Sequence, residues 1–309
     1  MKIQERISLK DFTTFRIGGP ARFFVTVTTA DDVTAAVAWA HERSLPLFVL
    51  GGGSNILFSD NGFEGLVIHT ALTEQSIIGN RVTLGASVVL ADAIEFSLSH
   101  GLIGMEFAAG IPGMVGGALR GNAGTFGKAM SDVVLTVSYV EQDSATGKTI
   151  THADCHFRYR HSCFKENNNI VTKTELQLTV GDVAASQKII NDRIAVRHQN
   201  HPLEPSAGCI FKNIELASID EKALQARGIE TDQFHKYMKV PTGYLIEQLG
   251  LKGKTIGGAQ ISSRHANYII NRGNATSDDV VTLISYVKQQ IRDRYDIQLE
   301  EEINIVAER

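Results

Sequence analysis

Two glycine-rich stretches are the parts of this chain whose residue types most favour a chemical role. Residues 50–55 (Leu-Gly-Gly-Gly-Ser-Asn) follow the apolar run 46–50, and residues 110–127 hold seven glycines, one proline and almost no charge. Glycine costs roughly 0.5–1 kcal/mol relative to alanine inside a helix or strand, so we expect no ordinary helix or strand over 110–127. Bare backbone N–H groups bind large anions, and two such loops predict a dinucleotide site.

Neither stretch is one of the common nucleotide-binding motifs. A Rossmann fingerprint needs G-x-G-x-x-G between a strand and a helix, whereas residues 51–55 lead into a second short apolar run at 56–58. We therefore expect a strand, a loop and another strand. The Gly-Lys-Ser/Thr ending of a Walker loop is also missing. The alternative is a pair of glycine-rich hairpin turns, but Asn55 and Asn122 beside the glycines favour binding loops.

The composition excludes several classes of protein. The chain has 309 residues, of which 43% are hydrophobic and 21% charged, with a net charge of −4, as expected for two or three soluble domains. The sequence lacks the basic patch of a nucleic-acid-binding protein, an apolar run of about 20 residues and a signal peptide at its start. Cys155, Cys163 and Cys209 form no CxxC pair and are expected as free thiols. We expect a cytoplasmic monomer without a metal.

Hydrophobic periodicity divides the chain into three units. The first, 1–70, alternates strands with a helix; the second, 71–182, is rich in strands and includes a hairpin over 133–152. A helix at 185–198 leads into the third unit, 196–296, and the end of the chain, 297–309, is expected to return as a strand to the first. Further strands are expected at 21–27, 46–50, 65–69, 81–84, 169–179 and 266–271, and helices at 31–41, 90–100, 243–250 and 277–295.

Seven blocks, in order along essentially the whole chain, resemble one family of flavoenzymes. That family is the UDP-N-acetylenolpyruvoylglucosamine reductases of bacterial cell-wall synthesis. A single glycine loop is weak support, whereas seven ordered blocks are specific. The blocks are 14–21 (Thr-Phe-Arg-Ile-Gly-Gly-Pro-Ala), 50–55, 110–117 with 122–124, 159–165 (Tyr-Arg-His-Ser-Cys-Phe-Lys), 206–213 (Ser-Ala-Gly-Cys-Ile-Phe-Lys-Asn), 257–260 and 302–305.

The resemblance implies an α+β fold. It would consist of a two-subdomain FAD-binding fold of the flavin-oxidase (PCMH-like) type and a C-terminal α+β substrate-binding domain. It also implies non-covalent FAD, NADPH as co-substrate, and a UDP-sugar enolpyruvate that is reduced to UDP-N-acetylmuramate. The short interval between Arg160 and Cys209 resembles the compact type of the enzyme, which lacks an extra loop with a substrate-facing tyrosine.

The same resemblance implies the residues that bind the flavin. The first glycine loop would wrap the pyrophosphate, and the second would run beside the isoalloxazine and ribityl chain. The implied cofactor-binding residues are Arg16, Gly51, Gly52, Gly53, Ser54, Asn55, Gly110, Ile111, Pro112, Gly113, Gly116, Gly117, Asn122, Ala123 and Gly124.

Arg160 and Glu302 match family residues that act on the substrate. Hydride addition to an enol ether beside a carboxylate creates negative charge on the neighbouring carbon, and a fixed cation lowers that barrier. Arg160 resembles this cation, since its planar fork suits a carboxylate. Glu302 would act as a protonated acid, its pKa raised by burial near like charge. The alternatives are a structural ion pair and a solvated acidic run over 300–302, in which at most one or two side chains can face a pocket.

Cys209 departs from the family, in which many members have serine as the proton donor to the carbanion. A free thiol has a pKa near 8.5 and can donate that proton, with the risk of oxidation if the thiolate forms. Ser206 is a competing donor but lies too far upstream in the motif. A small buried hydrophobe, the usual interpretation of a lone cysteine, fits Cys155 and Cys163 better.

Four residues resemble substrate contacts: Phe126, Lys212, Asn213 and His265. Phe126 stands where many members have tyrosine, so one hydroxyl contact would be lost. Asn200 stands where many have lysine, which leaves Arg197 or Lys212 as the cation for the pyrophosphate.

Two other functions compete with the reductase. An FAD-dependent alcohol or sugar oxidase of the same fold would react with oxygen and often tethers its flavin, but the blocks around Cys209 and Glu302 argue against it. A non-enzymatic nucleotide-binding module would need no proton donor.

Overall fold

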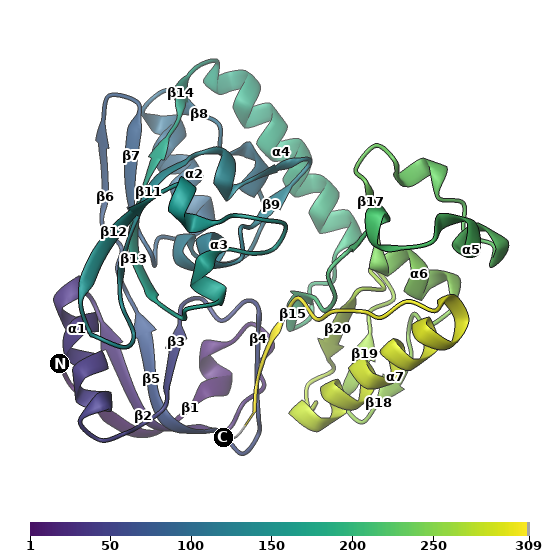
Figure 1. Cartoon of the computed structure of the whole chain (residues 1–309), viewed down its shortest axis with the longest axis horizontal. Coiled ribbons are helices and arrows are strands. Elements are labelled where there is room, and N and C mark those ends of the chain that lie inside the picture. The colour runs from purple at the N-terminus through teal and green to yellow at the C-terminus, as the bar shows by residue number, and fades with distance from the viewer. Residues whose placement is uncertain (308–309) are drawn as a thin grey trace.

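The computed structural model describes residues 1–307, so the last two residues of the predicted strand 297–309 lie outside the described part. A mixed sheet, an antiparallel sheet and their helices form one lobe, and a smaller lobe holds the C-terminal helices (Figure 1). The first sheet has the order β1-β2-β5-β3, with β2, β5 and β3 parallel and β1 antiparallel to β2. Its strands and the helix packed on it are β1 (Gln4–Ser8), β2 (Pro20–Val27), β3 (Leu47–Leu50), β5 (Phe63–Thr70) and α1 (Ala30–His41).

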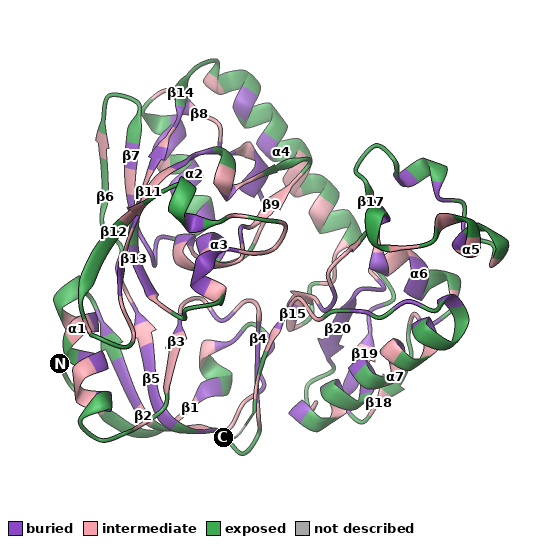
Figure 2. Cartoon of the chain, in the orientation of Figure 1, coloured by how far each residue is buried: buried purple, intermediate pink, exposed green. Residues whose placement is uncertain are grey.

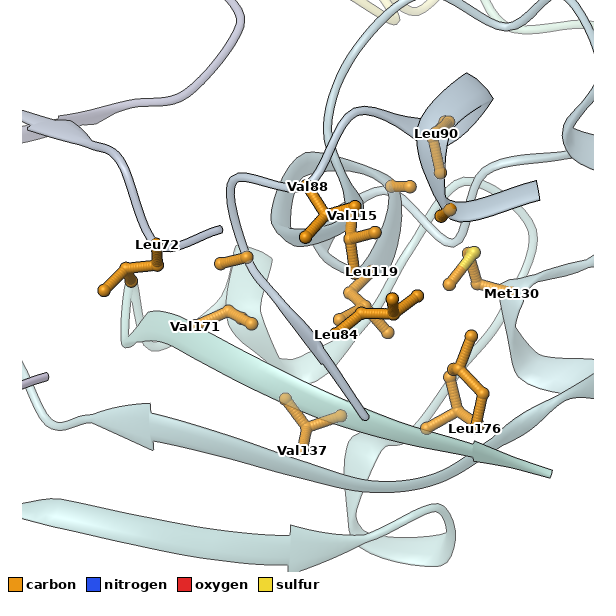
Figure 3. Close-up of a cluster of buried hydrophobic side chains, with 14 of the residues drawn as sticks. Leu72, Leu84, Val88, Leu90, Val115, Leu119, Met130, Val137, Val171 and Leu176 are labelled. Carbon is orange, nitrogen blue, oxygen red and sulfur yellow. The ribbon is translucent and has the colours of Figure 1, made fainter. Parts of the chain in front are cut away.

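The second sheet is antiparallel throughout and has the order β12-β11-β13-β7-β6. Its apolar face packs on two helices, and the side chains in Figure 3 belong to this core. Its elements are β6 (Gln75–Ile78), β7 (Arg81–Gly85), β11 (Val134–Val140), β12 (Gly147–Thr151), β13 (Ile170–Gln177), α2 (Leu90–Ser99) and α3 (Val115–Arg120). The same lobe also contains two separate two-stranded sheets: β8 (Leu102–Ile103) with β14 (Thr179–Val180), and β9 (Gly124–Thr125) with β10 (Lys128–Ala129).

The smaller lobe contains a third sheet of order β15-β20-β19-β18. The long helix α4 (Val183–Asn200) leads to it from the larger lobe (Figure 1). Its elements are β15 (Ser206–Cys209), β18 (Thr255–Ile256), β19 (Ala259–Ile261), β20 (Tyr268–Asn271), α5 (Glu221–Ala226), α6 (Thr242–Gln248), α7 (Ser277–Tyr295) and the pair β16 (Ile214–Glu215) with β17 (Lys239–Val240).

Local sequence explains the longest helix of this lobe. Thr276 accepts a hydrogen bond from the Asp279 N–H, and the Asp279 carboxylate accepts one from the Thr276 N–H, which forms a capping box at the start of α7. Val280, Ile284 and Val287 then recur at helical spacing and are buried. The helix predicted at 277–295 is confirmed.

Buried side chains connect segments that are distant in sequence. Phe15, Ile17 and Leu57 pack in the core of the C-terminal lobe, and a single cluster includes side chains from both sides of residue 70. Figure 2 shows this burial along the strands of both lobes. The boundary at residue 70 therefore stays a prediction, since no gap in the core marks it.

Two expectations need correction or detail. The second glycine stretch was expected to contain no ordinary helix, but it contains α3. Gly116 permits this, because a Cβ there would lie 2.9 Å from the Ala86 Cβ, so only glycine lets the helix approach β7 this closely. The returning strand is β21 (Asn304–Val306), which pairs in parallel with β4 (Ile56–Phe58) rather than with the first sheet.

Candidate active site

The two glycine-rich stretches meet in space. The Ser54 hydroxyl donates to the Pro112 carbonyl across 3.2 Å, so the first loop is fastened to the second. Thr14 joins the first loop to the smaller lobe: its N–H donates to the Gly53 carbonyl, and its hydroxyl donates to the Ser206 carbonyl across 2.7 Å. The loops thus lie between the first sheet and β15.

A cavity of about 840 Å³ lies at this junction. Six of the predicted cofactor-binding residues line it: Arg16, Gly51, Gly52, Ser54, Gly110 and Pro112. The other nine are outside the lining: Gly53, Asn55, Ile111, Gly113, Gly116, Gly117, Asn122, Ala123 and Gly124.

Several of those nine shape the loops. A Cβ at Gly53 would lie 2.0 Å from the Phe12 carbonyl oxygen, and one at Gly124 would lie 2.2 Å from that of Lys128. Asn122 is buried; its amide donates to the Arg158 carbonyl and its oxygen accepts from the Ser131 N–H, both across 3.0 Å. Steric contacts therefore explain the glycines at 53 and 124, and internal hydrogen bonds explain the asparagine at 122.

Asn55 connects the first glycine loop to the end of the chain. Its amide donates to the Glu302 carbonyl across 3.0 Å, and its own carbonyl accepts from the Asn304 N–H across 2.9 Å. The β4–β21 pair extends this connection. Asn55 thus fixes the strand that carries Glu302.

The cavity suits a large polar anion. His69 Nδ1 and Arg197 Nε are buried there and have no hydrogen-bond partner among residues 1–307. Burial lowers the pKa of Arg197, and its side chain lies against Gly110, where a Cβ would be 2.6 Å from Arg197 Cδ. Unpartnered buried donors beside bare glycines are what a dinucleotide with a pyrophosphate would satisfy.

The lining also contains residues that the sequence did not single out. These are Asp11, Phe12, Thr13, Thr14, His69, Met114, His198, His201, Pro202, Leu203, Glu204, Pro205, Gly208 and Tyr268; Arg197 and the competing donor Ser206 line it as well. His201 stands directly after α4 in a histidine-rich stretch that ends in proline, a pattern that could have drawn attention to it.

Arg160 and Glu302 form an ion pair with 2.8 Å between Nε and Oε1, although the Nε–H is not well aligned for a hydrogen bond. Arg160 also donates to the Gly124 carbonyl across 3.1 Å. Glu300 and Glu301 instead pair with Lys212 and Lys288, so of the acidic run only Glu302 reaches Arg160. The role of Glu302 at a substrate pocket stays a prediction.

Burial and cations act in opposite directions on Glu302. Burial raises the pKa of Glu302, and Arg160 and Lys165 partly oppose that effect. Burial also lowers the pKa of the Lys165 ammonium to about 8, with Arg120 and Lys212 acting in the same direction. A half-buried region with this excess of cations suits a substrate that brings its own negative charge.

Cys209 is half-buried at the end of β15. Burial raises the pKa of its thiol to about 12, and the Glu302 charge adds to this, while Arg160 and Arg197 oppose it. The Tyr268 hydroxyl, on the cross-strand partner of Cys209, also acts to lower the pKa of the thiol. Cys209, Arg160 and Glu302 therefore share one electrostatic environment.

The predicted substrate contacts are placed differently from one another. Lys212 pairs with Glu300 across 2.8 Å, and the Asn213 N–H donates to the Tyr159 hydroxyl across 3.3 Å. His265 lies beside Tyr268, with ring centroids 4.9 Å apart. Phe126 is 53% exposed on the turn between β9 and β10, under the Arg193 guanidinium, and is outside the cavity lining.

Comparison with known proteins identifies the family. Residues 199–306 match the model described as the UDP-N-acetylenolpyruvoylglucosamine reductase C-terminal domain, and residues 21–151 match that of the FAD binding domain. A protein named UDP-N-acetylenolpyruvoylglucosamine reductase from Solibacter usitatus is 37% identical over 96% of this chain and 94% of its own length. This chain belongs to the UDP-N-acetylenolpyruvoylglucosamine reductase family. Its relative of the same name from Lactobacillus delbrueckii subsp. bulgaricus is 35% identical over 100% of this chain and 96% of its own length.

A solved structure supports the fold of this family member. The UDP-N-acetylenolpyruvylglucosamine reductase (MurB) from Thermus caldophilus superposes with a TM-score of 0.79 at 30% identity, covering 99% of each chain. The predicted α+β fold, with an FAD-binding part and a C-terminal domain, is confirmed. The family member is an FAD-dependent oxidoreductase. Within residues 1–307, no helix is long and apolar enough to cross a membrane, and no cluster of three acidic, histidine or cysteine side chains could hold a metal.

Proposed function

We propose that this flavoenzyme uses NADPH to reduce the enolpyruvyl group of UDP-N-acetylglucosamine enolpyruvate to UDP-N-acetylmuramate, a step of peptidoglycan precursor synthesis. The observation that carries the proposal is the 2.8 Å ion pair of Arg160 with Glu302 in the environment of Cys209. The family names of the full-length relatives supply the substrate class.

FAD would be held non-covalently by the two fastened glycine loops, with Arg197 and His69 facing its polar groups. When bound, FAD would supply the hydride-transfer chemistry that connects NADPH with the substrate. The cavity at this junction is lined by residues of both glycine loops, which supports NADPH and substrate binding in turn and hence ping-pong kinetics with inhibition by excess substrate.

Three side chains would act on the substrate. Arg160, held by Glu302 and the Gly124 carbonyl, would stabilise the negative charge that spreads into the substrate carboxylate. Glu302, whose pKa is raised by burial, would donate a hydrogen bond when protonated. Cys209 would transfer its S–H proton to the neighbouring carbon and become a thiolate, so that hydride and proton together saturate the double bond.

Anaerobic stopped-flow spectroscopy tests this proposal. The flavin is reduced with NADPH, the enolpyruvyl UDP-sugar is added, and flavin absorbance and product are followed in wild type, Cys209→Ser, Cys209→Ala and the control Cys155→Ala, a buried thiol in the hydrophobic core of the larger lobe. We expect fast reoxidation in wild type and control, and loss of about 10²–10⁴-fold in Cys209→Ala, as for removal of a general acid. Cys209→Ser should retain more activity than Cys209→Ala.

Other outcomes would overturn parts of the proposal. Reoxidation by oxygen but not by the UDP-sugar would contradict the reductase and favour an alcohol or sugar oxidase; acid precipitation then shows whether flavin is tethered in the pellet. Full turnover in Cys209→Ala would assign the proton donor to another group.

A further inference from the structure

Tyr268 lies between Cys209 and a histidine. Cys209 and Tyr268 are directly paired residues of β15 and β20, and cross-strand partners have neighbouring side chains. The Tyr268 side chain is therefore next to that of Cys209, and its hydroxyl affects the pKa of the thiol. On its other side it is hydrogen bonded to His201 Nδ1 across 2.7 Å. The thiol, the hydroxyl and the imidazole therefore lie next to one another, and each carries an exchangeable proton.

Packing holds this chain in place. Tyr268 is only 8% exposed. Its ring meets that of His201 edge-on, with centroids 5.1 Å apart and planes at 70°, and the His265 ring contacts both. His201 is anchored directly after α4, where its N–H donates to the Arg197 carbonyl across 2.8 Å. The phenol and the imidazole cannot separate without disturbing the end of α4 or β20.

We propose that Tyr268 and His201 return a proton to Cys209 after each turnover, an inference that rests on the proposed function of Cys209. A thiol that gives its proton to carbon must recover one before the next cycle, and Cys209 is not among the residues that line the cavity. Tyr268 and His201 both line it, so they can carry a proton from the cavity to the sulfur.

The proton transfers balance without any other reactant than water. The Tyr268 O–H bond breaks as an S–H bond forms on the Cys209 thiolate, and the phenolate takes the proton from His201 Nδ1. His201 Nε2 receives a proton from solvent, so the ring passes from one neutral tautomer to the other and returns by exchange with water. One solvent proton enters for each proton delivered to the substrate carbon.

The electrostatics suit a neutral relay. Burial lowers the pKa of His201 to about 4, and the neighbouring His265 and Arg197 act in the same direction, so the imidazole is neutral at pH 7. Burial raises the pKa of the Tyr268 phenol and that of the Cys209 thiol. A thiolate at this site is therefore strongly basic and withdraws a proton from its partner.

The test separates the first turnover from later ones in Tyr268→Phe and His201→Ala. Wild-type and variant holoenzymes are reduced by NADPH and mixed with the enolpyruvyl UDP-sugar, first for one turnover and then at steady state. The initial thiol already carries its proton, so we expect first-turnover reoxidation within about threefold of wild type. Steady-state turnover should fall by about tenfold or more, after a burst of one product per flavin. Added imidazole should restore His201→Ala.

Matched controls are Tyr244→Phe and His235→Gln, which lie outside the cavity lining and should behave as wild type. Equal loss in the first and later turnovers would overturn the relay, because Tyr268 would then only position the thiol or the substrate. Unchanged steady-state turnover would overturn it as well, because water would then reprotonate the sulfur directly. Failure of the wild type to be reoxidised by the UDP-sugar would instead overturn the proposed function, and the relay with it.

Discussion

A buried thiol at position 209 behaves differently from one in water. In water a thiol is a much stronger acid than a serine hydroxyl, but burial and the Glu302 charge raise the pKa of Cys209 to about 12. Cys209 therefore keeps its proton at neutral pH, ready for transfer, and its thiolate exists only when a reaction step creates it. The oxidation expected of an activated cysteine is suppressed by the same burial.

This makes Cys209 a poor target for alkylating reagents. With a pKa of about 12 instead of about 8.5, the thiolate fraction at pH 8 is lower by about a thousandfold. We expect iodoacetamide at pH 8 to label Cys209 at least about a hundredfold more slowly than cysteine in a denatured sample of the same protein. Peptide mass spectrometry measures this directly. Rapid stoichiometric labelling of Cys209 in the folded protein would contradict the protonated thiol.

The role proposed for Arg160 depends on the planar shape of its guanidinium as well as on its charge. Its guanidinium reaches the Glu302 carboxylate and the Gly124 carbonyl simultaneously, which a lysine ammonium cannot reproduce. We expect Arg160→Lys to slow substrate-dependent reoxidation of the flavin by about 10²–10³-fold, while reduction by NADPH changes far less. The control is Arg158→Lys on the same loop, an exposed arginine paired with Glu166. Equal slowing of both half-reactions would show that Arg160 only supports the fold.

Some site residues could be predicted from the sequence and others could not. Cys209, Arg160 and Glu302 stand in local blocks whose residue types indicate their chemistry. Tyr268 gives no such indication, because it stands within an apolar run that predicts a buried strand. Only the register of β15 against β20 places its hydroxyl beside Cys209, and register is a property of two segments together.

At the scale of elements, the helices and strands were well predicted where periodicity was long. The limits of α7 match the prediction because its capping box and apolar face agree. Helix α3 was missed, since glycine content argues against a helix and nothing local shows that Gly116 faces Ala86. Tertiary packing, and not local sequence, therefore explains why this segment is helical.

Adjacent glycines in α3 offer a matched pair of variants. A Cβ at Gly116 meets Ala86, whereas one at Gly117 meets nothing within 4 Å. We expect Gly116→Ala to destabilise the flavin-free protein by about 1–3 kcal/mol. Gly117→Ala should change it little or stabilise it by up to about 1 kcal/mol.

The same pair tests where the flavin lies. If the second glycine loop runs beside FAD, the open space at Gly117 belongs to the cofactor, and Gly117→Ala should weaken FAD binding without lowering apoprotein stability. Chemical unfolding of the apoprotein and titration with FAD, followed by flavin fluorescence, measure both quantities. Unchanged FAD affinity in Gly117→Ala would show that the flavin does not use this space.

At the scale of the whole molecule, the cavity depends on both lobes at once. The larger lobe supplies the glycine loops, and the smaller lobe supplies Ser206, Tyr268 and the segment around His201, whereas Cys209 itself does not line the cavity. Thr14 and the β4–β21 pair hold these parts together. Burial lowers the pKa of three histidines in or beside this junction: His69, His201 and His265.

This arrangement predicts instability in acid. Between pH 6.5 and about 4, the unfolded chain protonates His201 whereas the folded protein, in which its pKa is about 4, does not. The unfolded state therefore binds more protons, so stability present above pH 6.5 is lost as the pH falls, by up to about 1.4 kcal/mol per pH unit for one such group.

Urea unfolding at pH 7, 6 and 5 should show a shallower pH dependence of the free energy of unfolding in His201→Gln than in wild type. The exposed His41→Gln should keep the wild-type slope, and because each slope is compared with wild type, the opposite contribution of Glu302 cancels. An unchanged slope in His201→Gln would mean that His201 titrates normally in the folded protein.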